Sequence, residues 1–329
     1  MKENLDFVVI GAQKAGTTSL FEYLRRHPDI CLPAGKEAPY FSHDEVYEDG
    51  WTAFLSKAAF VDEDRKWGTV TPHYMAGGVY EPSSTAVAGS YDERTIPLRM
   101  RECLPDVRIV AILRDPVERA RSHYQMGLMN GFERRSFDEA INELLQPDSL
   151  ERSRRYPDET TSYVTWGEYG RILAGYFDVF PADQVLVVFT DELERAPAQL
   201  LRRVHEFIGV DAEFTPDNLK VKYRSGGTER RLAWMSPYRS SSPQGLQRIA
   251  TRSETVRAAW HRLPAASRVR FKRNYESFSY RVDLWNRRTG RRMDEPSPAT
   301  IERLTAHFAR DGDQLAQLLG VTPPWLRST

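Results

Sequence analysis

Three short apolar runs rich in β-branched residues constrain the fold of this chain more than any other feature. They occupy residues 7–10, 107–113 and 185–189, and helical patterns such as 169–180 lie between them. Strands that are buried on both faces show such runs, and helices between strands give the right-handed crossovers of a parallel sheet. Residues 67–71 suggest a further short strand. The sequence therefore predicts an α/β fold with a mostly parallel central sheet flanked by helices.

The length of the chain and the pattern of its last third favour one domain. A chain of 329 residues suits one large α/β domain or two modest ones. Between residues 220 and 296 the regular pattern gives way to Gly, Ser, Pro and Arg, which favours loops over a second core. Residues 298–319 then have the apolar spacing of a closing helix. We expect a single domain over residues 1–329, with a less regular region at 220–296.

Charge and cysteine content argue against several classes of protein. The 46 Lys and Arg residues balance 46 Asp and Glu residues, which argues against a general nucleic-acid-binding surface. Cys31 and Cys103 are too few for a disulfide framework or a cysteine-based zinc site, and they favour a reducing compartment. No apolar run reaches the roughly 20 residues that span a bilayer, and the first residues resemble no signal peptide. We expect a cytoplasmic protein with no membrane span, no nucleic-acid partner and no metal.

The segment at residues 11–18 has the composition of an anion-binding loop. A glycine-bearing loop between a buried strand and a helix directs backbone N–H groups and the positive end of the helix dipole at one point. Lys14 adds a full charge, and Thr17 and Thr18 add hydroxyl groups. The Gly-x4-Gly spacing is that of a nucleotide-triphosphatase P-loop, but Thr17 stands where that motif has its lysine. The loop therefore predicts a phosphate site that lacks the usual arrangement for a magnesium nucleotide.

A second anion site is predicted where the strand at residues 107–113 ends. Arg114 lies at the carboxyl end of that strand, which is the edge where open α/β sheets bind ligands. Pro116 begins a helix, and Ser122 lies two turns along it. If Arg114 and Ser122 face one anion, the protein holds two phosphate-like groups at neighbouring strand ends.

These segments together resemble the sulfotransferases that use 3′-phosphoadenosine 5′-phosphosulfate (PAPS), above all the heparan sulfate N- and 3-O-sulfotransferases and their bacterial relatives. Residues 11–20 are similar to the 5′-phosphosulfate loop of that family, and residues 112–124 to its 3′-phosphate motif. Weaker similarity continues through 169–181 and 185–209. The resemblance implies a P-loop-like sulfotransferase fold. It also implies an enzyme that moves the sulfuryl group of PAPS to a hydroxyl or an amine and releases 3′-phosphoadenosine 5′-phosphate (PAP).

The resemblance also implies roles for individual residues on the donor side. Lys14 would contact the bridging oxygen and the 5′-phosphate, and its charge would assist catalysis. Arg224, in a late loop with a looser match, would add to the contacts of the 3′-phosphate. The full implied donor-binding set is Lys14, Ala15, Gly16, Thr17, Thr18, Arg114, Ser122 and Arg224.

On the acceptor side, Glu37 matches the glutamate that acts as general base in the heparan 3-O-sulfotransferases, and His73 is the alternative base and a candidate acceptor contact. The heparan enzymes have a lysine before a Thr-Pro pair, but this chain has Val70 there, which argues against a polyanionic glycan. The expected acceptor is a small molecule, a lipid or a carbohydrate. Aromatic residues that would line the acceptor site, with core packing as the alternative for each, are Tyr40, Phe41, Tyr74 and Tyr169.

Two other classes of function remain open on the residues alone. A P-loop kinase or nucleotide triphosphatase would bind ATP with magnesium and would carry a lysine at the position of Thr17. A non-catalytic nucleotide-binding module would bind PAP without turnover of any acceptor. Binding of PAP compared with binding of ATP and magnesium separates the first of these from a sulfotransferase.

Overall fold

The structure is a computed structural model, and the parts of the chain that it describes are residues 2–33, 36–58, 60, 62–82, 91–219, 228–230, 287–289 and 295–327. Contacts between Cα atoms divide the chain into two compact units. The first consists of Met1–His123, Asp138–Ser225 and Pro296–Thr329, and the second of Tyr124–Phe137 and Gly226–Glu295. That the whole chain forms a single domain stays a prediction.

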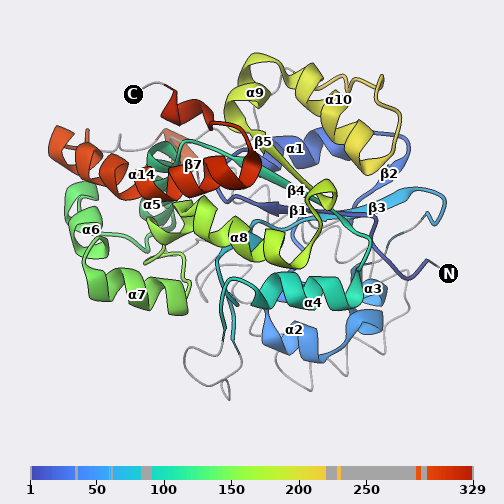
Figure 1. The fold of residues 1–329 in the computed structure, drawn as a ribbon, viewed down its shortest axis with the longest axis horizontal. Helices are drawn as coiled ribbons and strands as arrows, with labels where there is room; N and C mark the ends of the chain where they lie inside the picture. The colour runs from blue at the N-terminus through green and yellow to red at the C-terminus, as the bar shows by residue number, and fades with distance from the viewer. Residues whose placement is uncertain are drawn as a thin grey trace. The chain divides into compact units, whose positions relative to one another are not determined.

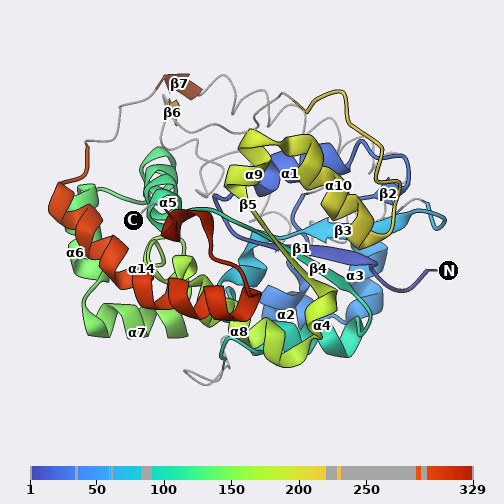
Figure 2. The same ribbon diagram turned by 45° about the horizontal axis from the view of Figure 1, so that its top comes forward.

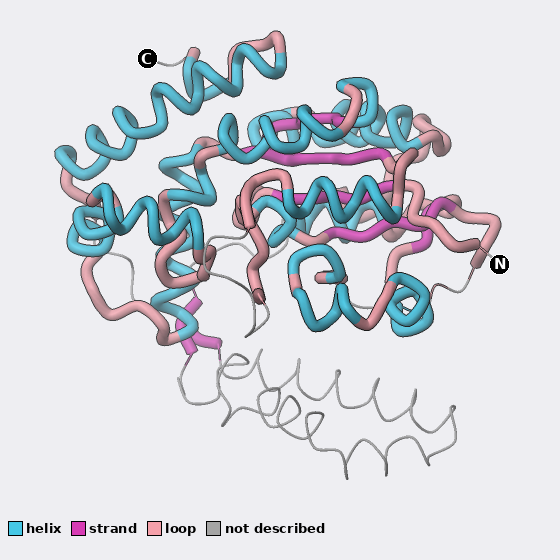
Figure 3. The backbone as a smooth tube through the Cα atoms, turned by 60° about the horizontal axis from the view of Figure 1, so that its bottom comes forward, coloured by secondary structure: helices cyan, strands magenta, loops and turns pink. Residues whose placement is uncertain are grey.

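A five-stranded sheet, parallel throughout, forms the centre of the first unit (Figure 1). Figure 3 shows its strands side by side in magenta. The predicted α/β class and the predicted strands are confirmed, whereas the two-residue β2 is too short to leave a pattern in the sequence. In spatial order the strands are β2 (Ile30–Cys31), β3 (Lys66–Val70), β1 (Phe7–Gly11), β4 (Arg108–Leu113) and β5 (Val185–Phe189).

Helices cover both faces of this sheet, with α1, α9 and α10 on one side and α4 and α8 on the other (Figure 1). The helices predicted near residues 18–24, 137–141, 169–180 and 298–319 are all present. The bounds are α1 (Thr17–Leu24), α2 (Asp44–Glu48), α3 (Trp51–Ala58), α4 (Thr95–Cys103), α5 (Pro116–Asn130), α6 (Phe137–Leu144), α7 (Pro147–Arg155), α8 (Tyr169–Val179), α9 (Thr190–Arg195), α10 (Pro197–Ile208) and α14 (Pro298–Leu319).

Alternate residues of β1 belong to two different hydrophobic clusters, one on each face of the sheet. Phe7 and Val9 pack in a cluster with the apolar side chains of α1 and α10. Val8 and Ile10 pack in a second cluster with those of α4 and α8. All four side chains are fully buried, because a central parallel strand has helices on both of its faces. Burial on both faces is therefore the physical reason for the continuous apolar run that predicts this strand.

Helix α14 lies along α8 and holds the beginning of that helix in place (Figure 2). The Asp311 carboxylate accepts hydrogen bonds from the backbone N–H groups of Gly170 and Arg171, at 2.9 Å each. Gly170 has no side chain, and a Cβ there would collide with the backbone carbonyl of Asp311. The closing helix therefore caps α8 and fixes the chain that leads into it.

The second unit contains a small antiparallel pair, β6 (Thr228–Arg230) with β7 (Arg287–Thr289). The predicted less regular region at 220–296 lies almost wholly outside the described residues, and so does Arg224. Within the described ranges, no helix combines the length and the apolar character needed to cross a membrane.

Candidate functional site

The loop between β1 and α1 turns sharply so that it meets the beginning of the helix. Lys14 has a φ of 70° and Gly16 a φ of 100°, both in the left-handed region that favours glycine. Gly16 is the N-cap of α1 and supplies no side-chain acceptor to the first turn. A helix that begins this way presents backbone N–H groups and the positive end of its dipole to an anion. We call residues Gly11 to Thr18 the donor loop.

The donor loop and the end of β4 are held at the same edge of the sheet. The Ala12 N–H donates to the Ile112 carbonyl at 2.7 Å. The Thr190 hydroxyl lies 2.7 Å from the Ala15 carbonyl and 3.0 Å from the Leu113 carbonyl, so it can donate to either. Ala15 directly follows Lys14, and Leu113 directly precedes Arg114. The two predicted anion sites, at the donor loop and at the end of β4, therefore lie at the same edge of the sheet.

Ser122 lies in α5, and its place at the 3′-phosphate stays a prediction. The next residue, His123, is fully buried, and burial together with the charges of Arg119 and Lys14 holds the pKa of its imidazole well below the ordinary value. The charge of Lys14 therefore acts on the turn of α5 that carries Ser122. Arg114 is partly exposed, with Nη2 3.4 Å from Glu118.

Arg119, in the first turn of α5, is fully buried next to His123. Its guanidinium bonds His123 Nδ1 at 3.2 Å and donates to the Tyr163 carbonyl. Among the described residues no carboxylate pairs with it, and burial lowers its pKa to about 10. An arginine without a counter-charge adds positive potential on the side of the site where the 3′-phosphate motif lies.

Lys36 and Glu37 approach the donor loop from the segment before η1 (Tyr40–Ser42). Lys36 Nζ donates to Thr17 Oγ1 at 3.1 Å and lies 3.5 Å from Glu37 Oε1. Glu37 Oε2 lies 3.8 Å from His73 Nδ1. Both predicted base candidates therefore stand beside one another, and a lysine connects them to the first turn of α1.

His73 lies on η2 (Pro72–Met75) and is held on its other side by Glu159. Glu159 Oε1 lies 3.2 Å from His73 Nε2 and accepts a hydrogen bond from Gln13 Nε2 at 3.0 Å. The ring of Tyr80 stacks on His73 with centroids 4.2 Å apart, and Trp166 meets it edge-on at 5.8 Å. In the described part of the chain, no three His, Cys, Asp or Glu side chains are grouped so as to hold a metal ion.

The four aromatic residues predicted to line the acceptor site are at most 3% exposed. Tyr40 and Phe41 pack with Trp51, the Tyr74 hydroxyl donates to the Ala38 carbonyl, and the Tyr169 hydroxyl donates to the Arg114 carbonyl at 3.0 Å. These contacts belong to the protein core, where large aromatic side chains bury most area. That any of them touches an acceptor stays a prediction.

Several residues of the site carried no clear signal in the sequence. Gln13 was part of the predicted loop, but nothing in its neighbours indicated a partner 146 residues away. Glu159 follows α7 in a segment without helical or strand periodicity. Thr190 comes directly after a predicted strand, and this position at the carboxyl end of a strand is the one indication in the sequence that it belongs to the site. The remaining predicted residues, Ala15 and Thr18, lie in the donor loop as expected.

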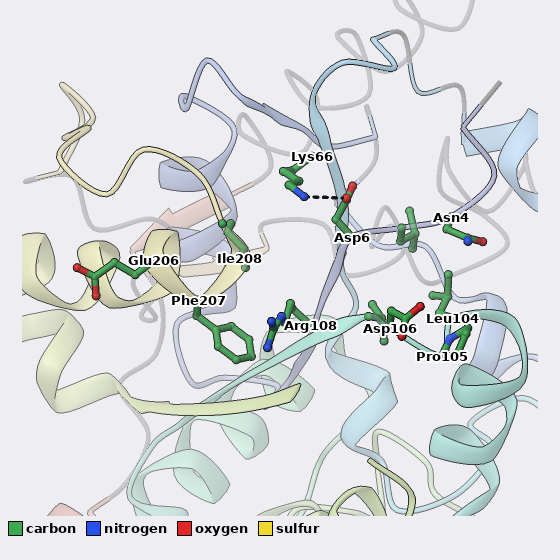
Figure 4. A pocket seen from close by; sticks show the side chains of 13 residues that line it. Asn4, Asp6, Lys66, Leu104, Pro105, Asp106, Arg108, Glu206, Phe207 and Ile208 are labelled. Carbon is green, nitrogen blue, oxygen red and sulfur yellow. Dashed lines mark hydrogen bonds and ion pairs between the residues drawn. The ribbon is translucent and has the colours of Figure 1, made fainter. Parts of the chain in front are cut away.

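A cavity of about 370 Å³ lies at the opposite edge of the sheet (Figure 4). Its lining includes Asp6 and Arg108, which stand at the amino ends of β1 and β4, and Lys66 at the start of β3. Figure 4 shows Lys66 paired with Asp6, at 3.3 Å. Because parallel strands all run away from this edge, the cavity is separate from the donor loop.

Comparison with known proteins assigns the family. A protein-family model described as the sulfotransferase domain matches residues 4–225 of this chain. The chain is 29% identical over 219 residues to mouse heparan sulfate glucosamine 3-O-sulfotransferase 3A1, covering 67% of this chain and 49% of that protein. It is 26% identical over 216 residues to the Drosophila melanogaster bifunctional heparan sulfate N-deacetylase/N-sulfotransferase, covering 62% of this chain and 19% of that protein. The chain thus spans about half the length of the 3-O-sulfotransferases it matches.

A solved structure supports the fold. The sulfotransferase from Alicyclobacillus acidocaldarius superposes with a TM-score of 0.62 at 23% identity, covering 98% of this chain and 99% of that one. This confirms the fold expected from the resemblance. The matched residues 4–225 contain the donor loop, Glu37, His73 and Arg114, all within one family model. The chain belongs to the sulfotransferase family.

Proposed function

We propose that this protein transfers the sulfuryl group of PAPS to a hydroxyl or amine of an acceptor and releases PAP. PAPS is the donor of the sulfotransferase family. The observation that carries the proposal is the Thr190 hydroxyl between the Ala15 and Leu113 carbonyls, because it holds the loop of Lys14 and the strand end of Arg114 together. A nucleotide with phosphate at both its 5′ and 3′ positions needs two such anion sites at one edge.

The chemistry of the donor loop fits the 5′ end of that nucleotide. The uncapped beginning of α1 and the cation of Lys14 favour an anion there. At Gly16, a Cβ would stand 3.1 Å from Leu193 in a backbone conformation that strains any other residue, so the close turn requires glycine. Arg114 and Ser122, with the buried charge of Arg119 behind them, would hold the 3′-phosphate.

The proposed reaction is an in-line displacement at sulfur. A bond forms between the acceptor oxygen or nitrogen and sulfur, while the bond from sulfur to the bridging oxygen of the 5′-phosphate breaks and its electrons remain on PAP. The proton of the acceptor goes to a base of the protein. Positioning and stabilisation of charge dominate such transfers, and Lys14 with the loop N–H groups would stabilise the charge that grows on the leaving phosphate.

Glu37 is the proposed general base, with His73 as its neighbour and alternative. Glu37 is 42% exposed, which leaves it accessible to an acceptor, and Lys36 lies between it and the donor loop. His73 Nδ1 is close enough to Glu37 for both groups to face one acceptor atom. An imidazole titrates near neutrality, so it suits the abstraction of a proton better than an ordinary carboxylate does.

Among the described residues, the carboxylates around His73 and His43 outnumber the one cation beside them, Lys36. Glu37 and Glu159 flank His73, and Glu81 lies 3.6 Å from His43. Burial lowers the pKa of the His43 imidazole, while the charges of Glu81 and Glu37 oppose that shift. Val70, where the heparan enzymes have a lysine, is fully buried. A neutral or cationic acceptor, such as a small molecule, a lipid or an uncharged carbohydrate, therefore suits this side better than a polyanionic glycan. The cytoplasmic location is likewise part of the proposal, to be checked by cell fractionation.

Titration with nucleotides tests the proposal directly. Thermal unfolding of the full chain should shift upward with PAP, and less or not at all with ATP and magnesium, because ligand stabilisation reports which nucleotide the folded state prefers. A preference for ATP with magnesium would favour a kinase or nucleotide triphosphatase instead.

An acceptor screen with sulfur-labelled PAPS follows. Transfer of label to any acceptor, dependent on Lys14, supports the enzyme. Binding of PAP with no transfer to any acceptor or to water would leave a nucleotide-binding module.

A further inference from the structure

Glu159 stands in a loop whose shape is set by hydroxyl groups. Between α7 and η3 (Thr165–Gly167), the Asp158 N–H donates to Ser162 Oγ at 3.0 Å. Ser153 Oγ, on α7, lies 3.1 Å from Ser162 Oγ and 2.8 Å from Thr165 Oγ1. These bonds join both ends of the loop, so the position of Glu159 is determined by the protein itself.

The carboxylate of Glu159 is nearly buried and bonds through one oxygen only. Its side chain is 11% exposed, and Oε1 serves both Gln13 and His73. Oε2 is buried and has no partner, and the same holds for Gln13 Oε1. By contrast, the buried carboxylate of Glu168 uses both of its oxygens, in bonds to Arg154, Arg171 and His307. Since an unpaired buried acceptor costs stability, the arrangement at Glu159 serves something other than stability.

One consequence concerns the proton on His73. An ionised carboxylate accepts hydrogen bonds and donates none, so His73 Nε2 must carry the hydrogen that faces Glu159. In the neutral ring, Nδ1 is then the open nitrogen, and it is the one that faces Glu37. His43 and His123 also lie within electrostatic reach of this ring, and Tyr80 covers one of its faces.

The other consequence concerns the donor loop. Gln13 lies between Ala12, which is bonded to β4, and Lys14, which has a left-handed backbone. Its bond to Glu159 therefore fixes the side of the loop that would hold the leaving phosphate. One oxygen atom thus connects the donor loop with the residue next to the general base.

We propose that Glu159 is a positioning residue that couples the donor loop to His73, fixing the Nε2–H tautomer of the imidazole through the same oxygen that anchors Gln13. This inference rests on the proposed function for its catalytic meaning, but its structural content stands alone. Carboxylates that orient metal-bound histidines change activity by about 10–100-fold when they are removed, and we expect an effect in that range for Glu159.

The tautomer of His73 is measured without any acceptor. In protein labelled with 15N-histidine, the imidazole nitrogens of His73, assigned by comparison with His73→Asn, should show protonated Nε2 and unprotonated Nδ1 at pH 8.5. In Glu159→Leu the two tautomers should become mixed, since the acceptor is gone. The control Glu81→Gln changes an exposed carboxylate near His43 and should leave the signals of His73 as they are. A protonated Nδ1 in the unmodified protein, or an unchanged tautomer in Glu159→Leu, would overturn the proposal.

The coupling is measured by a double-mutant cycle on sulfuryl transfer, to the acceptor found by screening or to water. The double variant Gln13→Leu/His73→Asn should lose activity by a factor at least about threefold smaller than the product of the losses of the two single variants. In the Glu159→Leu background the two losses should multiply. Multiplicative losses already in the unmodified background would refute the coupling. If neither PAP binding nor transfer occurs, the proposed function fails, whereas the tautomer still decides whether Glu159 positions His73.

Discussion

Glu37 lies between Lys36, which donates a hydrogen bond to the donor loop, and His73, whose other ring nitrogen contacts Glu159. Lys36 lies 3.5 Å from its Oε1, and His73 Nδ1 lies 3.8 Å from its Oε2. Glu37→Gln keeps the size of the side chain and removes its ability to take a proton. We expect it to lower sulfuryl transfer by about 10²–10⁴-fold while the affinity for PAP stays within about twofold.

Isothermal titration with PAP and a transfer assay with labelled PAPS measure both quantities on one preparation. The matched control is Glu45→Gln, an acidic residue in the first turn of α2 outside the site. Full activity of Glu37→Gln would contradict its role and move the base to His73.

The residues of the site differ in how well the sequence predicts them. Lys14 and Arg114 were predicted because each follows an apolar strand, and parallel strands bring such positions to one edge. Glu159 was not predictable, since a glutamate in an irregular loop shows no sign of burial until the fold brings Gln13 and His73 to it. For Tyr40 the sequence leaves core packing and contact with the acceptor open, because aromatic side chains serve both roles.

At the level of elements, the beginning of α1 depends on Gly16. Gly16→Ala places a Cβ 3.1 Å from Leu193 at a φ of 100°. Gly209→Ala is the matched control, because Gly209 has a φ of 76° with nothing within 4 Å of the added Cβ. Both variants should lose roughly 1 kcal/mol of unfolding free energy through the strained backbone.

Of these two, only Gly16→Ala should also weaken PAP binding, by about tenfold or more, because only that glycine lies in the donor loop. Urea unfolding and PAP titration measure the two effects. Equal PAP affinity in both variants would argue against an anion at the beginning of α1.

Helices α7, α8 and α14 meet at a joint that the buried carboxylate of Glu168 holds together by bonding Arg154, Arg171 and His307. Burial opposes its ionisation, but hydrogen bonds from His307 and Arg154 and the charge of Arg171 lower its pKa to about 2. Glu168→Gln removes the buried counter-charge of Arg154 and Arg171, although Arg171 keeps its pair with Glu93, and should cost about 2–3 kcal/mol of unfolding free energy. The exposed pair Glu151–Arg155 gives the control, since Glu151→Gln should leave the urea midpoint unchanged. Similar midpoints for the two variants would show that the network does not support the joint.

The sequence predicts elements better than their contacts. Strands β1, β4 and β5 were foretold by apolar runs because two layers of helices bury both faces of the sheet. The pairing of Asp311 with the beginning of α8 could not be foretold, since it joins residues about 140 positions apart through a geometry that only the folded chain creates. The fold is therefore largely readable from the sequence, whereas the polar connections of the site are not.

For the whole molecule, buried histidines predict how stability depends on pH. His205 is fully buried, neither ring nitrogen has a hydrogen-bond partner, and burial together with the nearby His27 lowers its pKa to about 4. Between that value and the ordinary value near 6.5, the unfolded chain binds more protons than the folded chain. The unfolding free energy should therefore fall as the pH falls from 6.5 toward 4.

His205→Phe removes this titration and keeps an aromatic ring beside Phe214. It should raise stability more at pH 5 than at pH 7.5, by roughly 1–2 kcal/mol of difference, as measured by urea unfolding at the two pH values. An equal effect at both pH values would show that His205 does not titrate on unfolding.

We propose that Lys14 and Arg114 hold opposite ends of one nucleotide. Calorimetric titration of PAP, 5′-AMP and 3′-AMP into the unmodified protein, Lys14→Ala and Arg114→Ala tests it most directly. Lys14→Ala should weaken PAP and 5′-AMP while leaving 3′-AMP unchanged, and Arg114→Ala should weaken PAP and 3′-AMP while leaving 5′-AMP unchanged, each by about 1–3 kcal/mol. Losses that do not depend on which phosphate the nucleotide carries, or the absence of PAP binding in the unmodified protein, would show that Lys14 and Arg114 do not hold the two ends of PAP.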